Sequence, residues 1–317
     1  MLITLFTTLL SAGLYAQNCS VAQLQNTSGS WKAGIQGSVT GVGAADLPKE
    51  KEVLAGIHKL LTTNYSPKGC EANYSFSYGS RSHYWADPYS YQLYILRYVC
   101  NKDKPGHHVE VSTPTTVRVA ANVIPSMDNF YAADLRDEPR GYLKLRERPV
   151  WKDGYYFLGE EVVGDGHLDH KIKAYRYLIT YDNELPFSYM SRKQYLLLLR
   201  SKLEQNIRES PGEAGYYRGF LNNISEYLKK PETELSKPAV CMWNQEERFE
   251  QFVEEGTKGS FLAVQPNPAY FRKLPRSSPQ FISVEYKISH GDPLYEQNMA
   301  AIQRAVDLKV LKQMLGK

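Results

Sequence analysis

The 317-residue sequence predicts an α+β protein built from antiparallel sheets and segregated helices. Two patterns predict this class. Alternating apolar and small residues, typical of strands, fill most of residues 74–123 and 155–181, whereas apolar residues at helical spacing fill residues 191–230 and 292–315. Because strand-rich and helix-rich stretches follow one another instead of alternating, the pattern favours an α+β fold over a parallel βαβ fold.

The composition is that of an ordinary globular protein, with 42% hydrophobic and 23% charged residues. The 38 Lys and Arg against 34 Asp and Glu give a formal net charge of +4, which is too small for a dedicated nucleic-acid binder. One count is unusual: the chain has 24 tyrosines but only 11 phenylalanines. The excess of tyrosine is therefore the feature of the composition that needs a structural or functional explanation.

Residues 1–16 have the layout of a cleavable secretory signal. The segment is uncharged, its apolar core is too short to span a bilayer, and small residues precede the expected cut between Ala16 and Gln17. No later apolar run approaches membrane length, so no transmembrane segment is expected after signal removal. The sequence predicts a secreted or periplasmic protein.

The first helix of the mature chain is expected near residues 48–61. Residues 17–45 are rich in Ser, Gly, Thr and Gln, and we expect them to be irregular. His58 stands beside the apolar face of the helix, where a solvated or capping role is expected. Pro48 stands near the helix start, and the apolar residues that follow recur on one face: Val53, Leu54, Ile57, Leu60 and Leu61.

Three strands are expected after this helix. Tyr74–Tyr78 alternates aromatic and small residues, and Tyr89–Cys100 is apolar or aromatic on both faces, as a covered strand is. Residues 101–106 contain Pro-Gly and form a turn, and Val117–Val123 alternates again. Residues 134–153 then carry dense mixed charge, which favours a solvated connection.

This connection suggests a domain boundary. On that interpretation, residues 17–145 form a Tyr-rich α+β region and residues 146–317 form a second α+β region. A single domain is the alternative.

The second region begins with a β-hairpin, in which Tyr155–Val163 and Lys171–Tyr181 flank a Gly-Asp-Gly turn. Two more strands are expected, at Phe261–Val264 and Phe281–Ile288, and a final helix is expected to begin at Asp292.

Two helix starts lie between these strands. Ser191 and Gln194 have the spacing of a capping box, and Ser210 precedes Pro211 at a first helical position. Together they predict a helical hairpin near residues 191–230.

Four cysteines, Cys19, Cys70, Cys100 and Cys241, allow three complete pairings. Because both Cys70 and Cys100 flank the same Tyr-rich strand region, their pairing is favoured. Buried free thiols are the alternative.

One short motif has the residues of a metal site. His167, Asp169 and His170 resemble three of the four positions in the His-x-His-x-Asp-His signature of the metallo-β-lactamase fold family. The resemblance implies zinc bound by imidazole and carboxylate, with hydrolytic activity. The sequence departs from it at the first position, which is Asp165, and only His290 follows as a further histidine. A polar hairpin turn is the other interpretation of these residues.

Other catalytic signatures do not occur. The sequence contains no Gly-x-Ser-x-Gly, no His-Glu-x-x-His, no Gly-x-Gly-x-x-Gly and no Walker-type loop, so it predicts no cofactor.

Eight tyrosines, by contrast, fall within the 34 residues 65–98. Tyrosine suits contact surfaces but also packs well in strands. If these residues form a surface, the candidate binding residues are Tyr74, Tyr78, Tyr84, Trp85, Tyr89 and Tyr91.

Several segments along the chain resemble exported bacterial proteins of unassigned function. They are Asn64–Cys70, Leu185–Phe187, Ser191–Leu196 and Pro279–Val284. The resemblance implies export and transfers no activity. The sequence as a whole predicts an exported soluble protein, a non-catalytic binding or structural module that meets an unidentified protein or glycan through a Tyr-rich surface. An exported metal-dependent hydrolase that uses His167, Asp169 and His170 is the alternative.

Overall fold

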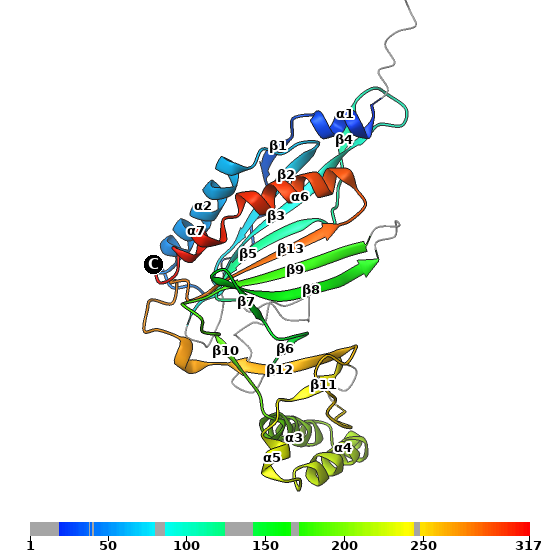
Figure 1. Ribbon diagram of the computed structural model, residues 1–317, viewed down its shortest axis with the longest axis vertical. Coiled ribbons are helices and arrows are strands. Elements are labelled where there is room, and N and C mark those ends of the chain that lie inside the picture. Colours follow the sequence, from blue (N-terminus) through cyan, green and yellow to red (C-terminus); the bar gives the residue numbers. More distant parts are fainter. Residues whose placement is uncertain are drawn as a thin grey trace, which may run out of the picture.

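The computed structural model describes residues 19–37, 39, 41–79, 86–123, 142–165, 171–243 and 248–317. They form an α+β structure with a nine-stranded sheet, a four-stranded sheet and helices that lie apart from the strands (Figure 1). The predicted fold class is therefore confirmed. None of the helices in these ranges is both long and apolar enough to cross a membrane.

The larger sheet has the order β1-β2-β3-β5-β13-β9-β8-β7, and β4 pairs with the end of β3. Its pairs are antiparallel, except that β1 runs parallel to β2. The N-terminal stretch that was expected to be irregular supplies both β1 and the helix α1. The strands are β1 Ser30–Ala33, β2 Cys70–Ser77, β3 Tyr89–Cys100, β4 His107–Val109, β5 Thr116–Ala121, β7 Val150–Lys152, β8 Tyr155–Asp165, β9 Lys171–Ile179 and β13 Ile282–Ser289.

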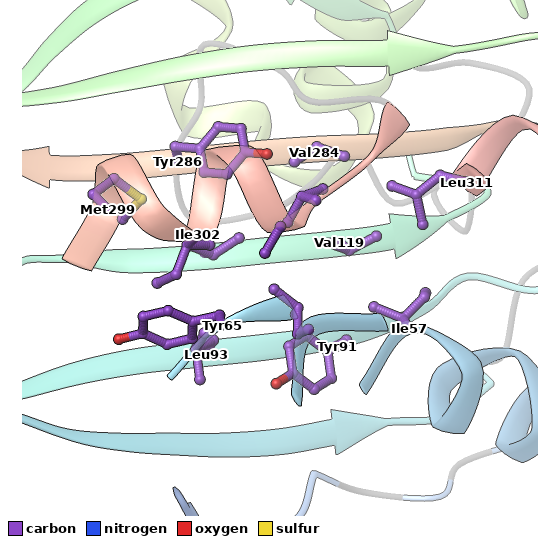
Figure 2. Close-up of a cluster of buried hydrophobic side chains, with 14 of the residues drawn as sticks. Ile57, Tyr65, Tyr91, Leu93, Val119, Val284, Tyr286, Met299, Ile302 and Leu311 are labelled. Atoms are coloured by element: carbon purple, nitrogen blue, oxygen red, sulfur yellow. The ribbon is translucent and has the colours of Figure 1, made fainter. Parts of the chain in front are cut away.

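Helices cover one face of this sheet (Figure 1). They are α2 Leu47–Asn64, α6 Pro293–Ala305 and α7 Leu308–Lys312, and α1 Val21–Asn26 lies at one end. Because side chains alternate along a strand, Leu93, Val119 and Val284 point to the same side, where Ile57 of α2 and Ile302 of α6 meet them (Figure 2). All five side chains are buried. Leu54 and Leu61 of α2 are buried beside Ile57, so the predicted apolar face of α2 is confirmed.

The smaller sheet lies at the other end of the molecule and carries the helical hairpin (Figure 1). Its central strand β12 pairs with β10, β11 and β6. The predicted capping box is present: the Gln194 backbone N–H donates to Ser191 Oγ (3.1 Å), and the Ser191 N–H donates to Gln194 Oε1 (2.8 Å). The elements are β6 Leu143–Leu145, β10 Phe187–Tyr189, α3 Arg192–Glu209, η1 Pro211–Glu213, α4 Ala214–Tyr227, α5 Glu232–Leu235, β11 Val240–Met242, β12 Ser260–Pro266 and η3 Pro268–Tyr270.

The nine-stranded sheet spans the suggested boundary at residue 145. Strand β13, near the C-terminus, lies between β5 and β9 and pairs with both. Part of the charged stretch that was expected to be a solvated connection instead forms β6 and β7. The two sequence regions therefore share one sheet.

The disulfide joins Cys19 to Cys100, with their Cα atoms 5.5 Å apart, and the predicted pairing of Cys70 with Cys100 is wrong. In the β2–β3 ladder, Cys70 lies opposite Arg97, three residues from Cys100. That offset corresponds to about 10 Å along a strand, which is too far for a disulfide. Cys70 is a buried free thiol, 3.6 Å from the Tyr65 hydroxyl, and Cys241 is also buried and free. The alternative of buried free thiols therefore holds for these two.

Candidate binding groove

Two of the predicted binding residues are core residues. Tyr89 and Tyr91 project from β3 toward the helices and are 2% and 0% exposed (Figure 2 shows Tyr91). The Tyr89 hydroxyl donates to the backbone oxygen of Ser277 (2.8 Å). Burial raises the pKa of both phenols well above the usual value. A surface site cannot use these two rings, because the sheet and the helices enclose them.

Tyr74 and Tyr78 are half-buried beside α2. The Tyr74 ring lies 4.1 Å from the His58 ring, and His58 Nδ1 lies 3.4 Å from the Tyr91 hydroxyl. His58 is therefore part of an aromatic cluster and not a solvated or capping residue, and burial lowers its pKa. Lys51 lies over the Tyr78 ring, 5.9 Å from its centroid. These partners leave Tyr74 and Tyr78 partly accessible at most.

The remaining predicted site residues lie outside the described residues. These are Tyr84 and Trp85, together with the proposed metal ligands His167, Asp169 and His170. Within the described parts of the chain, no group of three or more His, Cys, Asp or Glu side chains could hold a metal ion.

A groove of about 760 Å³ lies on the other face of the sheet, away from the helices. Its floor comes from β2, with Asn73 and Ser75, and from β3, with Tyr94 and Leu96. These residues alternate along the strands with those that face the helices, and Asn73 lies directly opposite Tyr94 in the ladder. The groove therefore uses one tyrosine of the Tyr-rich segment, on the face opposite to Tyr91.

Two segments form the walls. On one side stand residues 32–35, where the Gly34 N–H donates to the Tyr74 backbone oxygen (2.8 Å). A Cβ at Gly34 would meet Oδ1 of Asn73, so a larger residue here would displace the Asn73 side chain from its place in the floor. Residues 111–113 form the other wall. Each wall carries an apolar side chain in solvent: Ile35 is 95% exposed and Val111 is 98% exposed.

The lining is uncharged except at one end. Hydrogen-bonding groups come from amide and hydroxyl side chains, and the single charged side chain, Lys32, lies 3.5 Å from Glu71 Oε2. Among the described residues, the lining contains no imidazole or carboxylate. An aromatic floor with aliphatic walls and neutral polar groups suits a partly apolar ligand.

A cluster of charged side chains continues along the same face from the groove toward β9. Ser75, Gln92, Arg118, Glu285 and Arg176 are successive cross-strand neighbours in one row over five strands.

Arg176 joins two carboxylates in this cluster. Its Nε lies 2.7 Å from Glu285 Oε2, and its Nη1 lies 2.9 Å from Glu161 Oε2. Each carboxylate has a second cation: Lys287 lies 3.5 Å from Glu285, and Arg146 lies 3.7 Å from Glu161. Buried and half-buried ion pairs thus occupy this face where the groove ends.

The density of tyrosines in the sequence identified the correct segment but not the correct face. Tyr89 and Tyr91 have odd numbers and Tyr94 has an even number, so strand alternation alone places them on opposite faces of β3. No sequence signal indicated the walls, since residues 32–35 were expected to be irregular. Comparisons with protein-family models, with curated proteins and with solved structures give no significant match to this chain.

Proposed function

We propose that this chain is an exported, non-catalytic binding module that holds an extended segment of a partner protein in the groove. The observation that carries this proposal is the pair of aliphatic side chains, Ile35 and Val111, that stand almost fully exposed on the two walls. Exposed apolar side chains grouped around a concave site are typical of interaction surfaces. Export is supported by the signal-like residues 1–16 and by the Cys19–Cys100 disulfide, which an oxidising compartment permits.

The groove favours a protein segment over a glycan for two reasons. Aliphatic walls gain free energy by covering apolar side chains, whereas a sugar presents mainly hydroxyl groups. In addition, β1 stands at one end of the strand order, and its partner in the described residues is β2. The outer edge of such a strand can pair with an extended backbone.

A charged side chain on either wall should weaken partner binding. We expect the Ile35→Asp and Val111→Asp variants each to weaken partner binding at least tenfold, because a carboxylate would be desolvated against an apolar segment. Both side chains are exposed, so the fold should be unaffected. A photo-crosslinking amino acid at Ser112, within the groove, would identify the partner in the native envelope or medium. Affinity would then be measured with that partner by calorimetry.

Val162→Asp is the matched control, since Val162 is 55% exposed but belongs to β8, near the far end of the sheet. Equal partner affinity for the wall variants and this control would overturn the proposal. If parallel arrays showed binding to glycans but not to peptides, the occupant of the groove would be a carbohydrate and not a protein segment.

A further inference from the structure

One guanidinium near the groove, that of Arg118, has a buried N–H donor without an acceptor among the described residues. No hydrogen bond or ion pair joins Arg118 to any part of the chain that the structure describes, and its Nε atom is buried without a hydrogen-bond acceptor. Burial lowers the pKa of Arg118, although the Glu285 carboxylate acts in the opposite direction. An unsatisfied buried donor on a charged group costs free energy, so its presence calls for a ligand.

The neighbouring carboxylates do not supply this ligand. Glu285 lies opposite Arg118 in the β5–β13 ladder but contacts Arg176 and Lys287 instead. Glu161, the other carboxylate of the cluster, contacts Arg176 and Arg146. Three cations thus share these two carboxylates, and Arg118 contacts neither of them.

Arg118 lies on the face of the sheet that carries the groove, next to the residues that line it. It stands two strands from Ser75 in the same cross-strand row, with Gln92 between them. Tyr94, which forms part of the groove floor, lies opposite Thr116, so Arg118 is its diagonal cross-strand neighbour on the same face. We propose that Arg118 is an anion-binding site that receives a carboxylate from the bound segment, either an acidic side chain or a free C-terminus.

A carboxylate fits this site better than a doubly charged anion. The planar guanidinium presents N–H donors in a fork that matches the two oxygens of a carboxylate. A second negative charge would need another cation, and the other cations of the cluster contact Glu161 and Glu285. The source of the carboxylate rests on the proposed function, whereas the affinity of Arg118 for a carboxylate does not.

The first experiment tests the site with acetate alone. Thermal unfolding of the full chain would be compared in sodium acetate and in sodium chloride at equal ionic strength. We expect acetate to raise the midpoint more for the wild type than for Arg118→Gln, because acetate would satisfy the guanidinium of the folded state. Arg146→Gln is the control, since Arg146 is a 48% exposed member of the same cluster. An equal acetate effect in all three proteins would overturn the site.

The second experiment tests the source of the carboxylate. Arrayed synthetic heptapeptides, with and without Asp or Glu and with free or amidated C-termini, would be probed with the same proteins. We expect acidic or free-acid peptides to bind the wild type at least tenfold better than their neutral counterparts, and this preference to vanish in Arg118→Gln. Peptides that bind without a carboxylate preference would overturn the inference but leave the proposed function. An acetate effect without any peptide binding would support the anion-binding site and overturn the proposed function.

Arg118→Lys covers the case in which Arg118→Gln does not fold. Lysine keeps the charge but loses the fork, so a weakened acetate effect supports the site and an unchanged effect contradicts it.

Discussion

Glu50 shows how a single buried residue ties the stability of this fold to pH. It lies in the first turn of α2 with no exposed surface. Its Oε2 accepts the Gly79 N–H (2.7 Å), while Oε1 is buried without a partner among the described residues. Burial, with smaller contributions from the Asp87 and Asp46 carboxylates, raises the Glu50 pKa to about 8. Glu50 is therefore mostly protonated at neutral pH.

A raised carboxyl pKa makes the folded state bind a proton more tightly than the unfolded chain. The stability that this proton contributes is fully present below about pH 4.5, the pKa of Glu50 in the unfolded chain. It is lost progressively as the pH rises to about 8, the pKa in the folded state. The Glu50→Gln variant removes this loss. We expect it to match the wild type near pH 4 and to exceed it by on the order of 3 kcal/mol near pH 9. Urea unfolding across this range measures the difference.

The groups around Glu50 define the control. Asp87 pairs with Arg276 (2.7 Å), and the Asp46 carboxylate accepts a hydrogen bond from the Ser277 hydroxyl (2.7 Å), so each has a partner of its own. Glu52→Gln changes an exposed residue of the same helix and should leave the pH profile unchanged. Parallel profiles for Glu50→Gln and the wild type would contradict the prediction.

At the scale of elements, the first helix depends on a distant strand. Helix α1 has six residues, which is too short to be stable alone. The Cys19–Cys100 disulfide attaches the start of this segment to the end of β3, and Leu24 packs against Tyr98 and Leu294. Both a covalent bond and apolar burial therefore keep α1 in place.

Removing this bond should cost stability. We expect the double variant Cys19→Ser/Cys100→Ser to lose about 2–4 kcal/mol of unfolding free energy, because the bond closes a long loop in the unfolded chain. The two cysteines are 81 residues apart in the sequence. Chemical denaturation with and without dithiothreitol provides the measurement. Reduction should lower the stability of the wild type to that of the variant and leave the variant unchanged; a variant as stable as the oxidised wild type would argue against this role.

The scale of elements is also where prediction from sequence worked best. The α2 face, the β8–β9 hairpin and the Ser191 capping box depend on residues a few positions apart, so periodicity and spacing reveal them. The helix α1 and strand β1 were missed. They have only six and four residues, too few to show a periodicity, and β1 is held by its pairing with β2, about 40 positions away.

For the molecule as a whole, the last strand completes the sheet. Strand β13 lies between β5, from the N-terminal half, and β9, from the C-terminal half. Ile282 and Val284 of β13 are fully buried in the core that α2 and α6 cover. Without β13, the apolar sides of β5 and β9 would lose their central neighbour.

The N-terminal half should therefore not fold alone. We expect a fragment of residues 19–145 to lack cooperative thermal unfolding, because β5 would become an unpaired edge and α6 would no longer cover the core. Circular dichroism and dispersion of amide proton resonances check this. Co-expression with residues 146–317 should restore a folded complex. A fragment that melts cooperatively by itself would show an independent domain ending at residue 145.

The sequence alone determined the fold class, most of the elements and the segment that carries the groove floor, because these follow from local periodicity and composition. Only the tertiary structure decided the partner of Cys100, the face on which each tyrosine lies and the isolation of Arg118 from a carboxylate. The reason is physical. A ladder register, a disulfide and an ion pair join residues that are tens to hundreds of positions apart, and the order of strands in the sheet brings them together. Alternation along β3 puts Tyr91 and Tyr94 on opposite faces, and the helices packed on one face make Tyr91 a core residue while Tyr94 lines the groove.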